Sequence, residues 1–387
     1  MKNPRKVLVI ANNVRSIVCS AKKAGYSVYA LDRFGDVDMR RCADRAELIE
    51  NSQEGKLHEQ AESFGEVDIV ILGPGFENLK FENVFNNPGE VVEEVSDKSK
   101  LPKKLKSMGI PHPETESIDR AEGLGFPLLI KPKFGSGGMR NMIIRNGEEL
   151  TLFKERTDAC EFIAQEFLEG IPCSASIISN GDDAVVVAIN EQLIGVPWLT
   201  RLLFAYCGNI TPFDTKYHNE MIHHAKQVAL EFGLLGSNGV DFILTEKDIT
   251  VIEVNPRFQG SMDTVELSTG INIFDAHIKS FAGELPILKE PSCFAAKTIV
   301  YANKKVVIDK RISDALTGCM DRGRAADIPQ PGSVIQPDEP ITTALATAKT
   351  RSLVLEKVGK SSRYIKNMFD KPNDANPFLT GLSKTEA

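Results

Sequence analysis

The sequence predicts a protein of mixed α/β and α+β class, with a parallel sheet at its N-terminus and antiparallel strands later in the chain. Strand-like and helix-like segments alternate through residues 6–95, which is typical of a parallel sheet with helices on its faces. Two alternating segments at 239–244 and 250–255 flank a polar stretch, which indicates an antiparallel hairpin. The length of 387 residues suits two or three domains.

The composition is that of a soluble globular protein, with 42% hydrophobic and 26% charged residues. The formal net charge of −7 argues against general nucleic-acid binding, which requires a basic face. No apolar run approaches the roughly 18 residues of a membrane span, and the run at 7–11 is too short for a signal peptide. The seven cysteines form no CxxC pair, so we expect reduced thiols, a cytoplasmic location and no zinc site.

The first region contains strand-like segments at 6–11, 27–31 and 67–72, with a helical segment at 15–25 between the first two. The turn after the first strand lacks the GxGxxG pattern, so we expect no NAD or FAD. Open α/β sheets bind ligands at strand ends, although a polar turn explains polar residues there equally well. The polar residues at such ends are Asn12, Asn13, Arg15, Glu77 and Asn78.

A lysine, Lys131, lies near the end of the strand-like segment 126–132, and a second strand-like segment follows at 141–144. The glycine-rich loop between them can bring backbone N–H groups close to phosphate oxygens. A glycine cluster alone is often a flexible hairpin tip, but the preceding lysine and the flanking strands favour a phosphate-binding loop. It is not a Walker A loop, since GxxxxGK[ST] is absent. The loop residues are Gly135, Ser136, Gly137 and Gly138.

Three further segments complete the central region. Residues 162–170 run from an apolar strand into alternating polar residues before a glycine, which an edge strand would also show. Strand-like segments flank Asn180-Gly-Asp-Asp183, a strong hairpin signal. The irregular stretch 195–213 contains the single tryptophan, Trp198, which is either a wall of a substrate pocket or part of a packed loop. A helical pattern follows at 218–233.

The hairpin at 239–255 carries a compact set of polar side chains. Glu253 and Asn255 share one strand face, because side chains alternate with period two. Asp241 lies on the same face if the hairpin loop has an odd number of residues, and we expect a loop of three. These three side chains would then supply oxygen ligands suited to Mg²⁺. A solvated polar sheet face is the alternative interpretation.

The segment 252–257, Ile-Glu-Val-Asn-Pro-Arg, resembles the metal-binding strand of ATP-grasp enzymes. The lysine, the glycine loop, the segment at 162–170 and this strand occur in the order found in the biotin carboxylase and carbamoyl phosphate synthetase type, and the resemblance extends over residues 6–340. It implies a Rossmann-like domain at 1–95, an ATP-grasp domain at 96–290 with a hinge near 165–170, and a small β-rich region with a polar tail at 291–387.

The resemblance implies groups for the phosphates of ATP and for the metal ion. Lys131 and Arg257 take the catalytic positions, on the α/β phosphates and on the reacting phosphate respectively. A second phosphate-binding lysine, located just before a helix, matches Lys98, with Lys100 as the fallback. The implied ligands of Mg²⁺, or of Mn²⁺ in its place, are Asp241, Glu253 and Asn255.

The resemblance also implies an adenine site at the hinge. The backbone at Glu166 and Leu168 would bind the adenine edge, with Phe167 packed beside the ring. The ribose-binding glutamate of many relatives is replaced by Pro172, so that role would fall to Glu169 or to another group. The full set expected to bind the nucleotide is Lys98, Lys131, Gly135, Ser136, Gly137, Gly138, Gln165, Glu166, Phe167, Leu168 and Glu169.

The implied function is that of an ATP-dependent carboxylate–amine ligase acting on small metabolites through an acylphosphate. Biotin-type carboxylation is an alternative, but Gly260-Ser261 follows Gln259 where carboxylases carry the glutamate that activates bicarbonate. A nucleotide-binding module without turnover is a third interpretation. We expect small-molecule carboxylate and amine substrates, and no nucleic-acid or membrane partner. Relatives are often dimers, so a homodimer is one expectation for the assembly.

Overall fold

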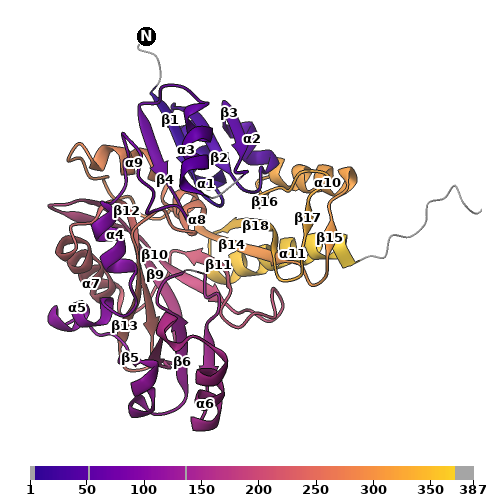
Figure 1. The fold of residues 1–387 in the computed structure, drawn as a ribbon. Helices are drawn as coiled ribbons and strands as arrows, with labels where there is room; N and C mark the ends of the chain where they lie inside the picture. The colour runs from indigo at the N-terminus through magenta and orange to yellow at the C-terminus, as the bar shows by residue number, and fades with distance from the viewer. Residues whose placement is uncertain (1–4, 51–52, 136, 371–387) are drawn as a thin grey trace, which may run out of the picture.

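The computed structural model describes residues 5–50, 53–135 and 137–370 of the chain. Figure 1 shows the N-terminal sheet at the top, a large sheet in the middle, a small sheet at the bottom and the C-terminal segments at one side. Across these described ranges, no helix has the length and apolar character needed to span a lipid bilayer.

The N-terminal region is a parallel four-stranded sheet with helices on both faces. Its elements are β1 (Lys6–Ile10), α1 (Arg15–Lys23), β2 (Ser27–Asp32), α2 (Val37–Cys42), β3 (Arg45–Leu48), α3 (Glu54–Glu62) and β4 (Ile69–Leu72), and the strand order is β3-β2-β1-β4. Val7 and Val9 pack on the side of α1, whereas Leu8 and Ile10 pack on the side of α3. Because both faces are covered, the strands are almost continuously apolar. This confirms the predicted Rossmann-like sheet.

A small antiparallel sheet follows two short helices. Its strand order is β5-β8-β6-β7, and its core includes Leu128, Ile130 and Phe153. The antiparallel pair β6–β7 flanks the glycine-rich loop, as the sequence predicts. The elements are α4 (Gly89–Ser96), α5 (Leu101–Ser107), β5 (Thr115–Ser117), the 3₁₀ helix η1 (Ile118–Leu124), β6 (Leu128–Pro132), β7 (Met142–Ile144), α6 (Gly147–Arg156), the 3₁₀ helix η2 (Ala159–Glu161) and β8 (Phe162–Glu166).

The large sheet has eight strands in the order β13-β12-β9-β10-β11-β14-β18-β16. Its elements are β9 (Ile171–Asn180), β10 (Ala184–Ile194), β11 (Tyr206–Thr211), α7 (His218–Glu231), β12 (Leu235–Leu244), β13 (Ile249–Asn255), α8 (Met262–Thr269), α9 (Ile273–Ser280), β14 (Phe294–Tyr301), β16 (Ala325–Ala326) and β18 (Pro340–Ala348). Met221 and Val228 of α7 pack in one core with Ile177 of β9. On the other face, α8 and α9 share a core with α1, which joins the N-terminal sheet to the large one.

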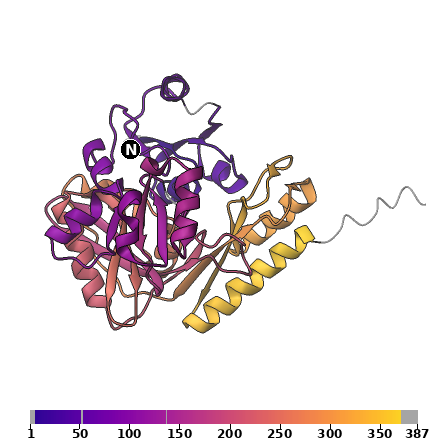
Figure 2. The same ribbon diagram turned by 60° about the horizontal axis from the view of Figure 1, so that its bottom comes forward.

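The C-terminal region continues the large sheet and also contains two helices. The remaining elements are β15 (Val306–Val307), α10 (Lys310–Asp321), β17 (Val334–Ile335) and α11 (Arg351–Asp370). Figure 2 shows α11 as a long helix at one side, and it packs against β14 and β18. The region contains the long helix α11 as well as strands, and the expected β-rich region at 291–387 and the boundaries at 95 and 290 stay predictions. The expected polar tail falls largely at 371–387, outside the described residues.

One disulfide contradicts the expectation that all the cysteines are free. Cys19 on α1 is bonded to Cys42 at the end of α2, with Cα atoms 5.1 Å apart and a sequence separation of 23. The absence of a CxxC pair does not reveal such a bond, because helix packing brings the two residues together. The five other cysteines are free thiols.

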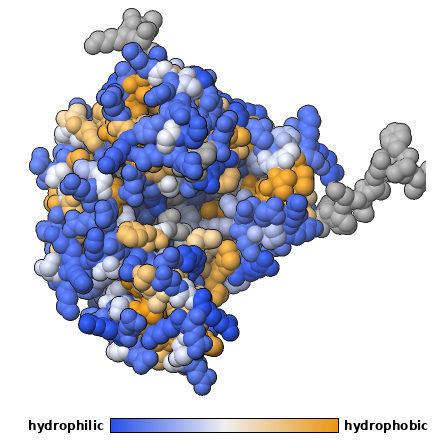
Figure 3. Space-filling model, in the orientation of Figure 1, coloured by the Kyte–Doolittle hydropathy of each residue, from blue (hydrophilic) through white to orange (hydrophobic). Residues whose placement is uncertain are grey.

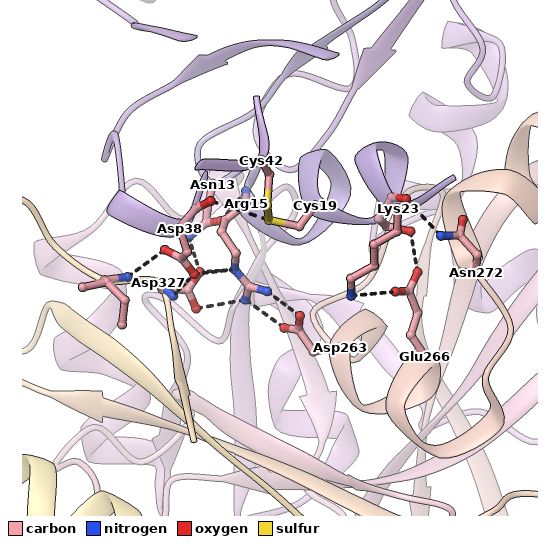
Figure 4. The surroundings of a disulfide bond; sticks show 12 residues. Asn13, Arg15, Cys19, Lys23, Asp38, Cys42, Asp263, Glu266, Asn272 and Asp327 are labelled. Carbon is pink, nitrogen blue, oxygen red and sulfur yellow. Dashed lines mark hydrogen bonds and ion pairs between the residues drawn. A yellow bond between two sulfur atoms is a disulfide. The ribbon is translucent and has the colours of Figure 1, made fainter. Parts of the chain in front are cut away.

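A buried arginine near this disulfide joins three parts of the chain (Figure 4). Arg15 donates from Nε to Asp327 Oδ1 at 2.9 Å and from Nη2 to Asp263 Oδ2 at 2.8 Å. Asp38 lies 3.6 Å from the guanidinium. Although burial opposes ionisation, the charges of Arg15 and Lys297 hold the pKa of Asp263 well below its usual range. Arg15 is therefore engaged by protein carboxylates, which favours a structural role over ligand binding.

Candidate active site

The register of β12 and β13 places Asp241 directly opposite Glu253. The hairpin loop, residues 245–248, has four residues, so the predicted three-residue loop is wrong. Asp241 nevertheless faces Glu253, because a bulge shifts the register between Asp241 and Phe242. One extra residue on β13 compensates for the even number of residues in the hairpin loop. The side-chain set therefore forms for a reason different from the one we expected.

Amide groups surround the Asp241 carboxylate. Gln192 Nε2 donates to Asp241 Oδ1 at 3.1 Å, and Asn255 Nδ2 donates to Asp241 Oδ2 at 3.1 Å. Burial, followed by the negative charge of Glu253, raises the pKa of Asp241 to about 7. Two crowded carboxylates are a natural site for a cation, which would relieve their repulsion. The donor set is therefore chemically suited to a hard divalent ion.

Two lysines approach the same carboxylates. Lys131 is buried, and burial lowers its pKa to about 8 against the opposing charge of Glu253. Lys98 Nζ lies 3.6 Å from Glu253 Oε1 and donates to the Gly135 carbonyl at 2.7 Å. The fallback candidate Lys100 instead lies 3.7 Å from Glu93 Oε1 and 3.6 Å from Asp97 Oδ2. Lys98, and not Lys100, is thus the second lysine beside Glu253.

A cavity of about 730 Å³ connects these groups to the hinge (Figure 3 shows this face hollowed below the N-terminal region). Its size falls in the range of small-molecule sites. Lys98 and Gly135 are not among the residues that line it, and Ser136 is outside the described residues. The predicted site residues that line the cavity are Lys131, Gly137, Gly138, Gln165, Glu166, Phe167, Leu168, Glu169, Asp241, Glu253, Asn255 and Arg257.

The tip of the glycine loop lies against the loop 195–205. Gly138 has a φ of +70°, and a Cβ there would collide with the Phe204 carbonyl. Glycine is required for both reasons, since only glycine adopts this conformation without strain and allows this approach. Trp198 does not line the cavity, so of the two interpretations of this residue the pocket wall does not hold. Leu203 and Phe204 of the same loop line it instead.

Arg257 is held by the N-terminal region. Its Nε lies 2.7 Å from Glu77 Oε1, and its Nη2 donates to Asn255 Oδ1 at 3.0 Å. Glu77 Oε2 accepts from the Gly75 N–H at 2.8 Å, which fixes the carboxylate. Of the strand-end candidates, Glu77 is thus the one in direct contact with the site. Asn13 instead donates to Asp327 in the Arg15 cluster, at 3.3 Å.

Several lining residues were not identified from the sequence. Gln192 and Ser174 lie on β10 and β9 and line the cavity beside Asp241 and Pro172. The period-two alternation of these strands would place Gln192 on one face with Asn190, but only the register with β9 shows which face is buried in the site. Tyr206 also lines the cavity and donates to Asn209 Oδ1 at 2.7 Å.

Comparison with known proteins gives a family match for the part of the chain that carries most of the cavity residues. A model of the ATP-grasp domain family matches residues 95–261. An uncharacterized protein of Methanocaldococcus jannaschii is 29% identical over 95% of each chain. The carbamoyl phosphate synthase large chain of Clostridium beijerinckii is 26% identical over 59% of this chain, which spans only 23% of that relative's length.

Among solved structures, the biotin carboxylase domain of Hydrogenobacter thermophilus 2-oxoglutarate carboxylase, in complex with MgADP, ADP and bicarbonate, has the same fold. Its TM-score is 0.72 at 17% identity, covering 93% of this chain and 90% of that one. Residues 95–261 therefore match the ATP-grasp domain family, and the chain shares the fold of that biotin carboxylase domain.

Proposed function

We propose that the chain is an ATP-dependent ligase that joins a small carboxylate to an amine through an acylphosphate, with release of ADP and phosphate. The observation that carries the proposal is the single cavity in which Asp241, Glu253 and Asn255 lie between a glycine loop and Arg257. Phosphoryl transfer depends mainly on positioning and on charge neutralisation. This cavity gathers the required charges in one place.

ATP would extend from the hinge to the carboxylates. The adenine would lie at 165–169, and the phosphates would lie near Lys131, Lys98 and the N–H groups of the glycine loop. Asp241, Glu253 and Asn255 would hold Mg²⁺, and Mn²⁺ suits the same oxygen ligands. The ion would neutralise phosphate charge and polarise the γ-phosphoryl group. Lys98, which lies at Glu253, is placed to move from that carboxylate to a phosphate oxygen.

The reaction has two displacement steps. A carboxylate oxygen of the substrate attacks the γ-phosphorus, and the bond to the β–γ bridging oxygen breaks as ADP leaves. The amine nitrogen then attacks the acyl carbon, phosphate leaves with the bonding electrons, and the nitrogen loses a proton. Arg257 stabilises the charge on the transferred phosphoryl group, and Glu77 fixes the orientation of its guanidinium.

Biotin-type carboxylation is less well supported. Gln259 lines the cavity, but Gly260 follows it and lies against the Tyr206 ring. No carboxylate therefore occupies the place of the bicarbonate-activating glutamate on this segment. Bicarbonate-dependent ADP release without an amine would favour the carboxylase over the ligase.

The test is phosphate release from ATP with pooled small carboxylates and amines. We expect turnover that requires both a carboxylate and an amine and that is lost in Glu253→Gln. Binding of ADP, followed by calorimetry, should persist in that variant, which separates loss of chemistry from loss of the fold. Tight ATP binding without phosphate release from any pool would contradict the ligase and favour a binding module.

A further inference from the structure

The phosphate end of the cavity has an apolar wall. Leu203 and Phe204 line it, and Phe204 lies against the glycine loop at Gly138. Tyr206 lies against Gly260, three residues after Arg257. In the arrangement of ATP proposed above, the wall would therefore lie next to the reacting phosphate. Leu203 is 66% exposed, so most of its side chain is available to a ligand.

The loop that carries this wall is held from both sides. Within the loop, the Gly195 N–H donates to the Ala205 carbonyl at 2.9 Å, and a Cβ on Gly195 would collide with the Leu203 backbone. Outside it, Arg201 donates twice to Asp338, at 2.7 Å each. Lys366 of α11 donates to a carbonyl of the same loop at 3.2 Å. The apolar side chains are thus presented on a fixed backbone.

The cationic side chains that line the cavity already face carboxylates of the protein. Among the described residues that line it, the cations are Lys131 and Arg257. Lys131 interacts with Glu253 and Asp241, and Arg257 is paired with Glu77. The wall itself offers the Leu203 and Phe204 side chains and the neutral polar groups of Tyr206 and Gln259. A second anionic group on a substrate would therefore meet apolar and neutral side chains on this wall and no cationic partner among them.

We propose that the carboxylate substrate carries an apolar side group, branched aliphatic or aromatic, that packs on Leu203 and Phe204. This inference rests on the ligase function proposed above and specifies its substrate class. The carboxylate must approach the γ-phosphate under the glycine loop, and its side group then meets this wall. Leu203 and Phe204 are accordingly specificity-determining residues, which contact substrate without taking part in proton or phosphoryl transfer.

The experiment uses hydroxylamine as the amine, because it traps an acylphosphate as a hydroxamate without the natural acceptor. The full chain with Mg²⁺ and ATP is given 4-methylpentanoate or leucine, and separately glutarate or glutamate. We expect kcat/KM for the apolar acid to exceed that for its dicarboxylate counterpart about tenfold or more, both for 4-methylpentanoate against glutarate and for leucine against glutamate. Leu203→Glu should lower kcat/KM for the apolar acids by a similar factor with the KM for ATP unchanged, and Leu203→Met should retain it.

The outcomes separate the substrate class from the ligase function. Equal use of the dianionic acids, or unchanged selectivity in Leu203→Glu, would overturn the apolar assignment and leave the ligase intact. Phosphate release with a dianionic acid from a wider carboxylate pool, with no apolar acid active, would do the same. No phosphate release with any carboxylate pool would overturn the ligase itself.

Discussion

The contact between Glu77 and Arg257 predicts that the N-terminal region contributes directly to turnover. The two groups are 2.7 Å apart, and their side chains are only 19% and 14% exposed. Hydrogen bonds to charged groups contribute about 1.5–3 kcal/mol, and solvent screening reduces this little at such burial. At roughly 1.4 kcal/mol per tenfold change in rate, full loss corresponds to about a 10- to 150-fold fall in kcat if Arg257 acts in the transition state.

Two substitutions of Glu77 should lower kcat by different amounts. Glu77→Ala removes the whole contact, and we expect the full decrease in kcat. Glu77→Gln keeps a neutral acceptor, and because charge-assisted bonds are about twice as strong as neutral ones, kcat should fall only about 4- to 12-fold. The KM for ATP should change little in either variant, since Glu77 does not contact the nucleotide in the proposed arrangement.

The assay is steady-state phosphate release under saturating substrates, with Glu82→Gln as the matched control. Glu82 is an exposed residue on the same connection after β4. Equal kcat values for Glu77→Ala and for the control would refute the idea that Glu77 positions Arg257. A change in the KM for ATP with kcat unaltered would also refute it.

Three further predictions concern stability and pH. Arg15→Met removes the guanidinium that faces Asp263, Asp327 and Asp38 and leaves Lys297 as the cation at Asp263, so urea unfolding at pH 7 should show a loss of about 3–5 kcal/mol; a loss below 1 kcal/mol would contradict a structural role of the Arg15 cluster. Because burial lowers the pKa of Lys131 to about 8, the charged form is lost as pH rises through 8, and ATP affinity measured by calorimetry should weaken from pH 7 to 9 but not in Lys131→Arg. Cys19→Ser removes the cross-link to Cys42, which closes a separation of 23 residues, and should lower unfolding free energy by about 2–4 kcal/mol under non-reducing conditions; equal stability with and without reductant would argue that the bond does not form.

The sequence was most informative where strand periodicity and motif order reinforced each other. The alternation through 6–95 predicted the parallel sheet, and the strands around the glycine loop were placed correctly. The shared face of Glu253 and Asn255 follows from period two alone. The partner strand could not be placed in the same way, because a single bulge changes register and residues near a hairpin do not reveal it.

Contacts between distant segments were the main features that the sequence could not supply. Asp263 and Asp327 meet Arg15 across separations of 248 and 312 residues, and nothing local to Arg15 signals this. The disulfide depends similarly on how α1 packs on α2. The helix α11 follows a β-rich stretch, and its assignment there depends on packing against β14 and β18.

The loop 195–205 shows how a correct region can yield the wrong residue. From the sequence, Trp198 was either a wall of a substrate pocket or part of a packed loop. In the structure its carbonyl accepts from Lys366 and its ring lies near Gly359 of α11. Leu203 and Phe204, five and six residues later, face the cavity instead. Loop direction depends on tertiary contacts, so composition could not choose among them.

The central claim is that Asp241, Glu253 and Asn255 together hold one divalent ion on the phosphates of ATP. The most direct measurement is a crystal structure of the chain with Mn²⁺ and a non-hydrolysable ATP analogue, with the ion located by anomalous scattering. We predict an anomalous peak within about 2.0–2.4 Å of oxygens from both strands, with the γ-phosphate beneath the glycine loop and beside Arg257. A peak bound elsewhere, or a nucleotide whose phosphates lie away from these three side chains, would contradict the account.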